Sequence, residues 1–277
     1  MDFNRRGTEA KQENKIYTMK KIVIAISILM MSISCGEIFA QKDGFSLHLS
    51  GVFPNGKFGE FGATLWEEHF DTRVDGGAAS TGFGLGVKYQ HSISSIKNLR
   101  AMFEADVMYN PLQEEIKDQF DELSVSWDGD LISSSVSTSK YLNIPLMAGL
   151  NYSFDLAEKV KLYGELGVGL NVRLITKTSI EKEIKKIWYD GGYDDERHEE
   201  TRTYKLEFEY NPAVSFAYQV GVGVLLSEKL SVGLNYYNLG SAKVKGTYED
   251  DGAKERSLDG FYSISPSMLT LKVGYHF

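Results

Sequence analysis

The chain has 277 residues, of which 42% are hydrophobic, and it carries 38 acidic residues against 30 basic ones. This length allows one large or two small domains, and no Pro-rich or Ser-rich stretch divides the chain, so one domain is expected. The acidic balance and the lack of a basic cluster in the sequence argue against nucleic-acid binding. Its 27 glycines and 16 tyrosines, beside five prolines, favour a β-rich structure.

The N-terminal segment has the features of an export signal. Lys20 and Lys21 precede an apolar run over residues 22–31, and the small residue Ala40 stands before Gln41. Because this run is too short to cross a bilayer as a helix, residues 19–40 are interpreted as a secretory signal peptide that is removed. Residues 1–18 are polar and are interpreted as a misassigned extension ahead of the true start codon, which leaves residues 41–277 as the mature chain.

The single cysteine, Cys35, lies inside this signal. Cleavage as a lipoprotein after Ser34 is the weaker interpretation, because Ser32 stands where such signals usually carry leucine. The mature chain then has no thiol, which excludes disulfides and cysteine-based metal sites. Removal of residues 1–40 leaves 24 basic and 34 acidic residues, a net charge of −10. No apolar run of eighteen residues follows, so residence in a membrane would require a closed β-barrel.

Eight segments alternate between apolar and polar residues with a period of two. In chain order they cover residues 44–53, 82–90, 101–109, 141–154, 160–175, 202–226, 230–237 and 269–277. The pattern is clearest from Val160 to Ile175, where the even positions are apolar or glycine and the odd positions include Glu165 and Arg173. Ten residues suffice for a strand to cross a bilayer, so this length predicts a transmembrane β-strand with lipid on the even side and a polar lumen on the odd side.

The connections between these segments alternate in length. Long ones follow the first, third, fifth and seventh segments and short ones follow the others, which is typical of a membrane barrel with short periplasmic turns and long external loops. Residues 112–139 are expected to form a loop with a small hairpin at Asp128 and Gly129. Strands five and six are expected to project beyond the membrane as a hairpin, because the alternation continues through residues 202–210. We predict an all-β, eight-stranded antiparallel up-and-down transmembrane β-barrel with long external loops.

Three stretches resemble a known family. Residues Tyr141–Leu146 (YLNIPL), the Gly-rich run Tyr163–Leu170 and the terminal Val273–Phe277 are similar to the small porin-like or outer-membrane-protein-A-like barrels of Gram-negative bacteria. The resemblance covers residues 41–277 and implies an outer-membrane β-barrel domain, exported through the signal peptide and embedded in outer-membrane lipid. Within it, Tyr275 and Phe277 look like the carboxy-terminal signal that such proteins present to the barrel-assembly machinery.

The interior of an eight-stranded barrel is wide enough only for side chains or one small ligand. Charges withdrawn from water must be paired, so the inward positions predict a structural polar network in the lumen. Its members are Lys88, Glu104, Asp106, Glu165, Arg173 and Lys272, and the further inward polar candidates are His48, Gln90, Tyr163 and Gln219. A narrow porin-like conduit or gate for ions or small solutes is the alternative interpretation of the same residues.

Catalytic and metal chemistry have little support in the sequence. The histidines at 48, 69, 91, 198 and 276 have no serine or carboxylate at an interpretable spacing, although distant residues can meet in space. We therefore expect no catalytic residue and no enzymatic activity, with a lipid-modifying outer-membrane enzyme as the second alternative. The acidic stretches 127–130, 189–196 and 248–252 lack the spacing of a helix-loop-helix calcium site. No metal or cofactor is expected.

The favoured function is a structural or surface-interaction role. The barrel would anchor the chain in the outer membrane, and the acidic external loops, above all residues 176–211, would face outside. The sequence does not identify their external partner.

Overall fold

The computed structural model describes residues 44–60, 77–93, 95–115, 130–189, 197–243, 245–250, 256–257 and 263–277. The predicted extension (residues 1–18) and signal peptide (residues 19–40) lie outside the described residues, as do residues 127–129, 190–196 and 251–252 of the acidic stretches. The chain separates into two units, Met1–Asp43 and Gly44–Phe277. All described residues belong to the second unit.

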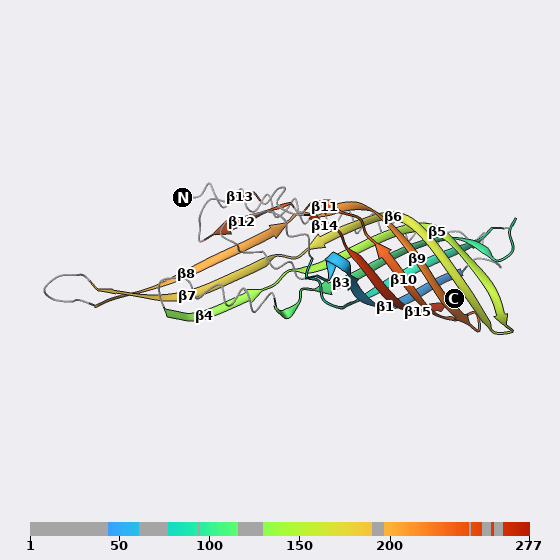
Figure 1. Ribbon diagram of the computed structural model, residues 1–277, viewed down its shortest axis with the longest axis horizontal. Coiled ribbons are helices and arrows are strands. Elements are labelled where there is room, and N and C mark those ends of the chain that lie inside the picture. Colours follow the sequence, from blue (N-terminus) through green and yellow to red (C-terminus); the bar gives the residue numbers. More distant parts are fainter. Residues whose placement is uncertain are drawn as a thin grey trace. The chain divides into compact units, whose positions relative to one another are not determined.

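Eight strands of this unit form a closed antiparallel barrel (Figure 1). Each strand pairs with the next along the chain, and the first pairs with the last from Ser46 opposite His276 to Asn55 opposite Ser267. The barrel strands are β1 (Gly44–Asn55), β2 (Gly82–Ser92), β3 (Leu99–Pro111), β5 (Lys140–Ala157), β6 (Val160–Ile175), β9 (Ala213–Leu226), β10 (Leu230–Asn238) and β15 (Ser267–His276). This confirms the predicted eight-stranded antiparallel barrel.

A five-stranded sheet continues part of the barrel wall, and we name it the external sheet. Its order is β13 (Arg256–Ser257), β12 (Gly246–Asp250), β8 (Arg197–Tyr210), β7 (Thr178–Tyr189) and β4 (Asp130–Ser137). The hairpin of β7 and β8 prolongs the pair β6 and β9 over twelve residue pairs, from Thr178 opposite Phe208 to Tyr189 opposite Arg197 (Figure 1). The predicted projecting hairpin is therefore present. Strand β12 occupies a segment that was expected to be a loop, and β4 lies where a small local hairpin was expected but pairs with β7 instead.

The remaining elements are small. A 3-10 helix, η1 (Gly56–Phe58), follows β1, and the two-residue strands β11 (Ala242–Lys243) and β14 (Ser263–Ile264) pair with each other. Among the residues that the structure describes, no helix has the length and apolar character needed to cross a membrane.

The outer surface of the barrel is apolar. Leu166 is 63% exposed whereas its neighbour Glu165 is only 3% exposed, as the alternation of β6 predicts. Leu49, Phe83, Phe216 and Val222 are similarly exposed on other barrel strands. A soluble monomer rarely exposes so large an apolar surface, so the band is suited to contact with lipid.

The two ends of the barrel differ. We name the end with the short connections the turn end and the other the loop end. From the middle of the barrel to the loop end, a cluster of buried hydrophobic residues occupies the interior, namely Val52, Phe58, Ala79, Met108, Tyr141, Met147, Ala217, Tyr237, Leu239, Ile264 and Met268. Phe58, Ala79, Leu239 and Ile264 lie outside the barrel strands, so the connections fold inward over this end. The ring of Phe58 packs edge-on against Tyr141 at 5.1 Å, and the Tyr141 hydroxyl donates to the Gly77 carbonyl at 2.8 Å.

Candidate functional site in the barrel lumen

Inward positions alternate between long polar side chains and glycines that make room for them. Gly86 on β2 lies opposite His48 on β1 and Asp106 on β3. A Cβ atom at Gly86 would overlap both Asp106 Oδ1 and His48 Nε2. In the same way, a Cβ atom at Gly233 would overlap the Tyr163 hydroxyl. Without these glycines, the narrow interior could not hold its charged side chains.

An ionic cluster crosses the middle of the lumen, and we name it the central network. It consists of His48, Lys88, Glu104, Asp106, Glu165, Tyr237 and Lys272, none of which is more than 7% exposed. Lys88 Nζ lies 2.7 Å from a carboxylate oxygen of Glu104 and 2.7 Å from one of Glu165. Since β2 and β6 are not neighbours in the barrel, the pair of Lys88 and Glu165 spans the lumen.

The other basic groups of this cluster come from β1 and β15, which follow β2 around the barrel. Lys272 Nζ contacts Glu104 Oε1 and lies 3.4 Å from Asp106 Oδ2. His48 Nε2 lies 2.5 Å from Asp106 Oδ1. Each of the three buried carboxylates therefore has a basic partner, as charges withdrawn from water require.

Two residues that contact these carboxylates, Tyr237 and Asn235, were not named as candidates in the sequence analysis. The Tyr237 hydroxyl lies 2.5 Å from Glu104 Oε1 and 3.0 Å from Asp106 Oδ2, and Asn235 Nδ2 donates to Glu165 Oε1. Strand parity places both residues inward on β10. It does not reveal that an aromatic residue would use its hydroxyl in an ionic cluster.

Arg173, which the sequence grouped with these residues, lies elsewhere. It is eight residues from Glu165 on the same strand, a separation of about 26 Å at the usual rise of a β-strand. Its Nη1 donates to the Ile264 carbonyl at 2.9 Å, beneath the apolar residues of the loop end. The structure thus brings together five of the six predicted residues and places Arg173 in a separate environment.

Three residues of the central network have the chemistry of metal ligands. Ligand atoms of His48, Glu104 and Asp106 lie within 4.8 Å of one another. However, Lys272 Nζ contacts Glu104 and approaches Asp106, and Lys88 Nζ contacts Glu104. Lysine ammonium groups supply the positive charge that these carboxylates need, so the arrangement gives no reason to invoke a metal ion.

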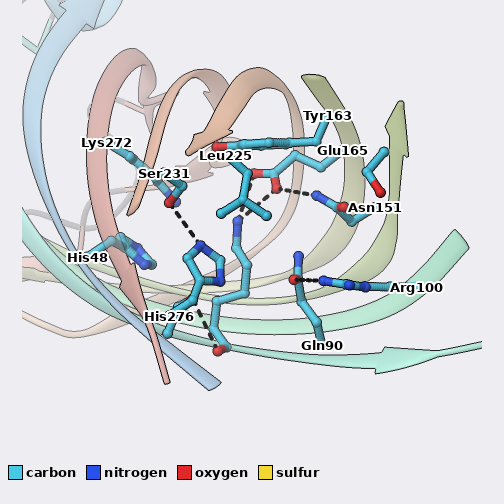
Figure 2. A pocket seen from close by; sticks show the side chains of 13 residues that line it. His48, Gln90, Arg100, Asn151, Tyr163, Glu165, Leu225, Ser231, Lys272 and His276 are labelled. Atoms are coloured by element: carbon cyan, nitrogen blue, oxygen red, sulfur yellow. Dashed lines mark hydrogen bonds and ion pairs between the residues drawn. The ribbon is translucent and has the colours of Figure 1, made fainter. Parts of the chain in front are cut away.

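A small polar cavity adjoins the central network on the side of the turn end (Figure 2). Its lining includes Ser46, Gln90, Arg100, Ser231 and His276, and its volume of about 30 Å³ is large enough for ordered water. Arg100 Nη1 donates to Gln90 Oε1 at 3.4 Å, near the limit of a hydrogen bond.

The same cavity contains a serine and histidine pair that the sequence spacing did not reveal. His276 Nε2 lies 3.0 Å from Ser231 Oγ (Figure 2). Among the described residues, no carboxylate hydrogen-bonds to His276, so the pair lacks the third group that orients a catalytic imidazole.

The last residues of the chain complete the barrel seam. The Phe277 amide donates to the Phe45 carbonyl at 2.9 Å, beyond the last residue of β15. Tyr275 and Phe277 are 46% and 72% exposed on the outer surface, and their rings pack edge-on at 5.2 Å. Both side chains are therefore accessible from outside the barrel.

Comparison with known proteins agrees with this fold. A family model described as outer membrane protein β-barrel domain matches residues 55–277. No curated protein matches the chain. Similar solved structures include a major outer membrane protein from Thermus thermophilus, with 13% identity over 86% of this chain and 100% of that chain and a TM-score of 0.40. OprG from Pseudomonas aeruginosa has 11% identity over 85% and 95%, with a TM-score of 0.39. Ail of Yersinia pestis, solved in complex with the heparin analogue sucrose octasulfate, has 11% identity over 85% and 97%, with a TM-score of 0.35.

Proposed function

Because the chain belongs to the outer membrane protein β-barrel family, we propose that it is a surface-interaction protein whose barrel anchors the external sheet in the outer membrane. In such barrels the short turns face the periplasm and the long connections face outside. The turn end is then periplasmic, and the external sheet stands above the outer leaflet. We also infer that outward apolar side chains contact outer-membrane lipid, and that Tyr275 and Phe277 engage the barrel-assembly machinery.

The observation that carries this proposal is the ordered hairpin of β7 and β8. Its twelve cross-strand residue pairs lie beyond the barrel strands. Ion pairs add to this backbone pairing, some across the hairpin and some between residues close in the chain. Glu207 lies 2.5 Å from Lys177 and 2.8 Å from Lys205, and Lys185 lies 2.6 Å from Glu199. A paired backbone with neutralised charges offers a partner a fixed surface, which reduces the entropy lost on binding.

The filled lumen supports anchoring over transport. The central network crosses the interior, and apolar residues fill the loop end. The alternative, a narrow conduit, is favoured by one observation, the polar cavity that reaches Lys88 and Glu165 from the turn end. We expect no lipid-modifying activity, because Ser231 and His276 line this cavity and do not belong to the lipid-facing rows.

A trimmed variant tests the proposal. Residues 179–207 are replaced by Asn-Gly, which joins Thr178 to Phe208, a cross-strand pair, through a two-residue turn. Cells that lack the gene are complemented with the full or trimmed chain, and their adherence to plates coated with anionic glycans, basic protein or nothing is measured. We expect the full chain alone to promote adherence to at least one surface. Equal adherence of the two strains on every surface would contradict the proposal.

Measuring the conductance of the purified protein in planar bilayers distinguishes the anchoring function from the alternative function as a conduit. Anchoring predicts no steady current, since side chains occupy the lumen. Steady channels that disappear when Lys88 is changed would favour the conduit.

A further inference from the structure

Arg173 is a buried cation with no anionic partner in the part of the chain that the structure describes. Its side chain lies in the lumen and the residue is only 2% exposed. Nη1 donates to the Ile264 carbonyl, but Nε and Nη2 have no hydrogen-bond partner. A carbonyl oxygen satisfies one N–H group without neutralising the guanidinium charge. A buried charge is normally paired, so this position calls for a counter-ion.

The surrounding side chains add a further unsatisfied donor. Asn143 on β5 lies directly opposite Arg173, and both side chains face the lumen. Asn171 Nδ2 donates to Asn143 Oδ1 at 3.1 Å, which fixes the orientation of the Asn143 amide. Asn143 Nδ2 is left without a partner. Three donor nitrogens without a partner and one positive charge thus lie on directly paired residues of β5 and β6.

No carboxylate of the central network is free to serve as the counter-ion. Glu104, Asp106 and Glu165 are all held by basic groups. A water molecule could satisfy the free N–H groups of Arg173, and also the Asn171 Oδ1 acceptor, which has no partner. Water would leave the charge unbalanced, whereas an anion would satisfy both the N–H groups and the charge.

We propose that a small inorganic anion with the size and charge of chloride binds in the outer half of the lumen at Arg173 Nε and Nη2 and Asn143 Nδ2. The apolar residues Tyr141 and Ile264 close the loop end beside it, and both are buried. They exclude water, which strengthens the attraction between the anion and the guanidinium. Arg173, Asn143 and Asn171 are all at most 2% exposed, and this burial favours a monatomic ion over phosphate. This site is independent of the proposed surface function.

The decisive variant is Asn143→Asp, which places a carboxylate opposite Arg173 and keeps the oxygen that accepts from Asn171. We expect the unfolding midpoint of the wild-type protein, followed by heat-modifiable gel migration, to rise saturably when sodium gluconate is replaced by sodium bromide at constant ionic strength. In Asn143→Asp, the internal carboxylate should abolish this dependence and raise the midpoint in gluconate.

Two further variants complete the experiment. Arg173→Gln should lose the bromide dependence, whereas Lys97→Gln, which removes one exposed positive charge in the turn between β2 and β3, should keep it. Crystals grown in bromide should show an anomalous peak beside Arg173. Equal midpoints in the two salts for the wild-type protein, or a full bromide response in Asn143→Asp, would overturn the proposal even if Arg173→Gln fails to fold.

Discussion

At the scale of single residues, inward glycines determine whether the lumen can hold its charges. Gly86→Ala would force a methyl group into His48 and Asp106, and overpacking of this kind costs about 1–3 kcal/mol. Gly164→Ala is the matched control, because its nearest neighbour would lie 3.9 Å away. Urea unfolding in lipid vesicles should show a clear loss of stability for Gly86→Ala alone. Equal midpoints for the two variants would contradict the packing argument.

The central network also predicts that Lys272 makes a large contribution to the stability of the barrel. Lys272→Met removes one of the basic partners of both Glu104 and Asp106, and breaking a buried ion pair from one side costs about 3–5 kcal/mol. Lys161→Met provides the comparison, because its pair with Glu228 at 2.6 Å is largely exposed and such pairs contribute about 0–1 kcal/mol. The free energy of unfolding in vesicles should fall several-fold more for Lys272→Met. A loss no greater than that of Lys161→Met would show that the network adds little stability.

At the scale of elements, the turn between β9 and β10 is conformationally strained. Ser227 and Glu228 have φ angles of 52° and 60°, and the Lys229 amide donates to the Leu226 carbonyl at 3.1 Å. The connection has three residues, because Leu226 pairs with Leu230, and it contains a β-turn over residues 226–229. Both central residues of this turn have left-handed backbone, which favours Asn-Gly. Replacing Ser227-Glu228 with Asn-Gly should stabilise the barrel by about 1 kcal/mol, because the relieved strain exceeds the value of the lost exposed ion pair. Unchanged or lower stability in vesicles would argue against strain.

The stability of the hairpin of β7 and β8 should depend on pH through the ionisation of Glu207. Burial acts to raise the pKa of this carboxyl, but hydrogen bonds and attraction from Lys177 and Lys205 outweigh it and lower the pKa below its ordinary value. The contribution of the ionised Glu207 carboxylate to the stability of the hairpin is therefore present above the pKa of this group in the unfolded chain, about 4.3. It is lost as the pH falls through the lower pKa of the folded state. A carbon-13 NMR titration should place the Glu207 midpoint below that value. Lys205→Gln should raise the midpoint, and no change would contradict this pairing.

The sequence predicted the barrel better than the external sheet because the two depend on different information. A barrel strand such as β6 shows its two faces through local alternation, which is visible in the chain itself. Strand β4, with the sequence DLISSSVS, has a weak alternation and depends on pairing with the distant β7. The same limit applies to the lumen. Parity placed Lys88 and Glu165 inward, but only the closed barrel brings these two strands face to face across the interior.

At the scale of the whole molecule, the barrel and the external sheet are expected to be energetically separable. The central network is built entirely from β1, β2, β3, β6, β10 and β15, and none of its residues belongs to the hairpin of β7 and β8. The trimmed chain with Thr178 joined to Phe208 should therefore insert into vesicles, remain heat-modifiable and unfold within about 1 kcal/mol of the full chain, as expected when a change lies far from a buried network. Adherence would then be lost without loss of the fold. A trimmed chain that fails to insert would instead make the external sheet part of the barrel's own folding unit, and would require the surface role to be tested with substitutions on β7 and β8.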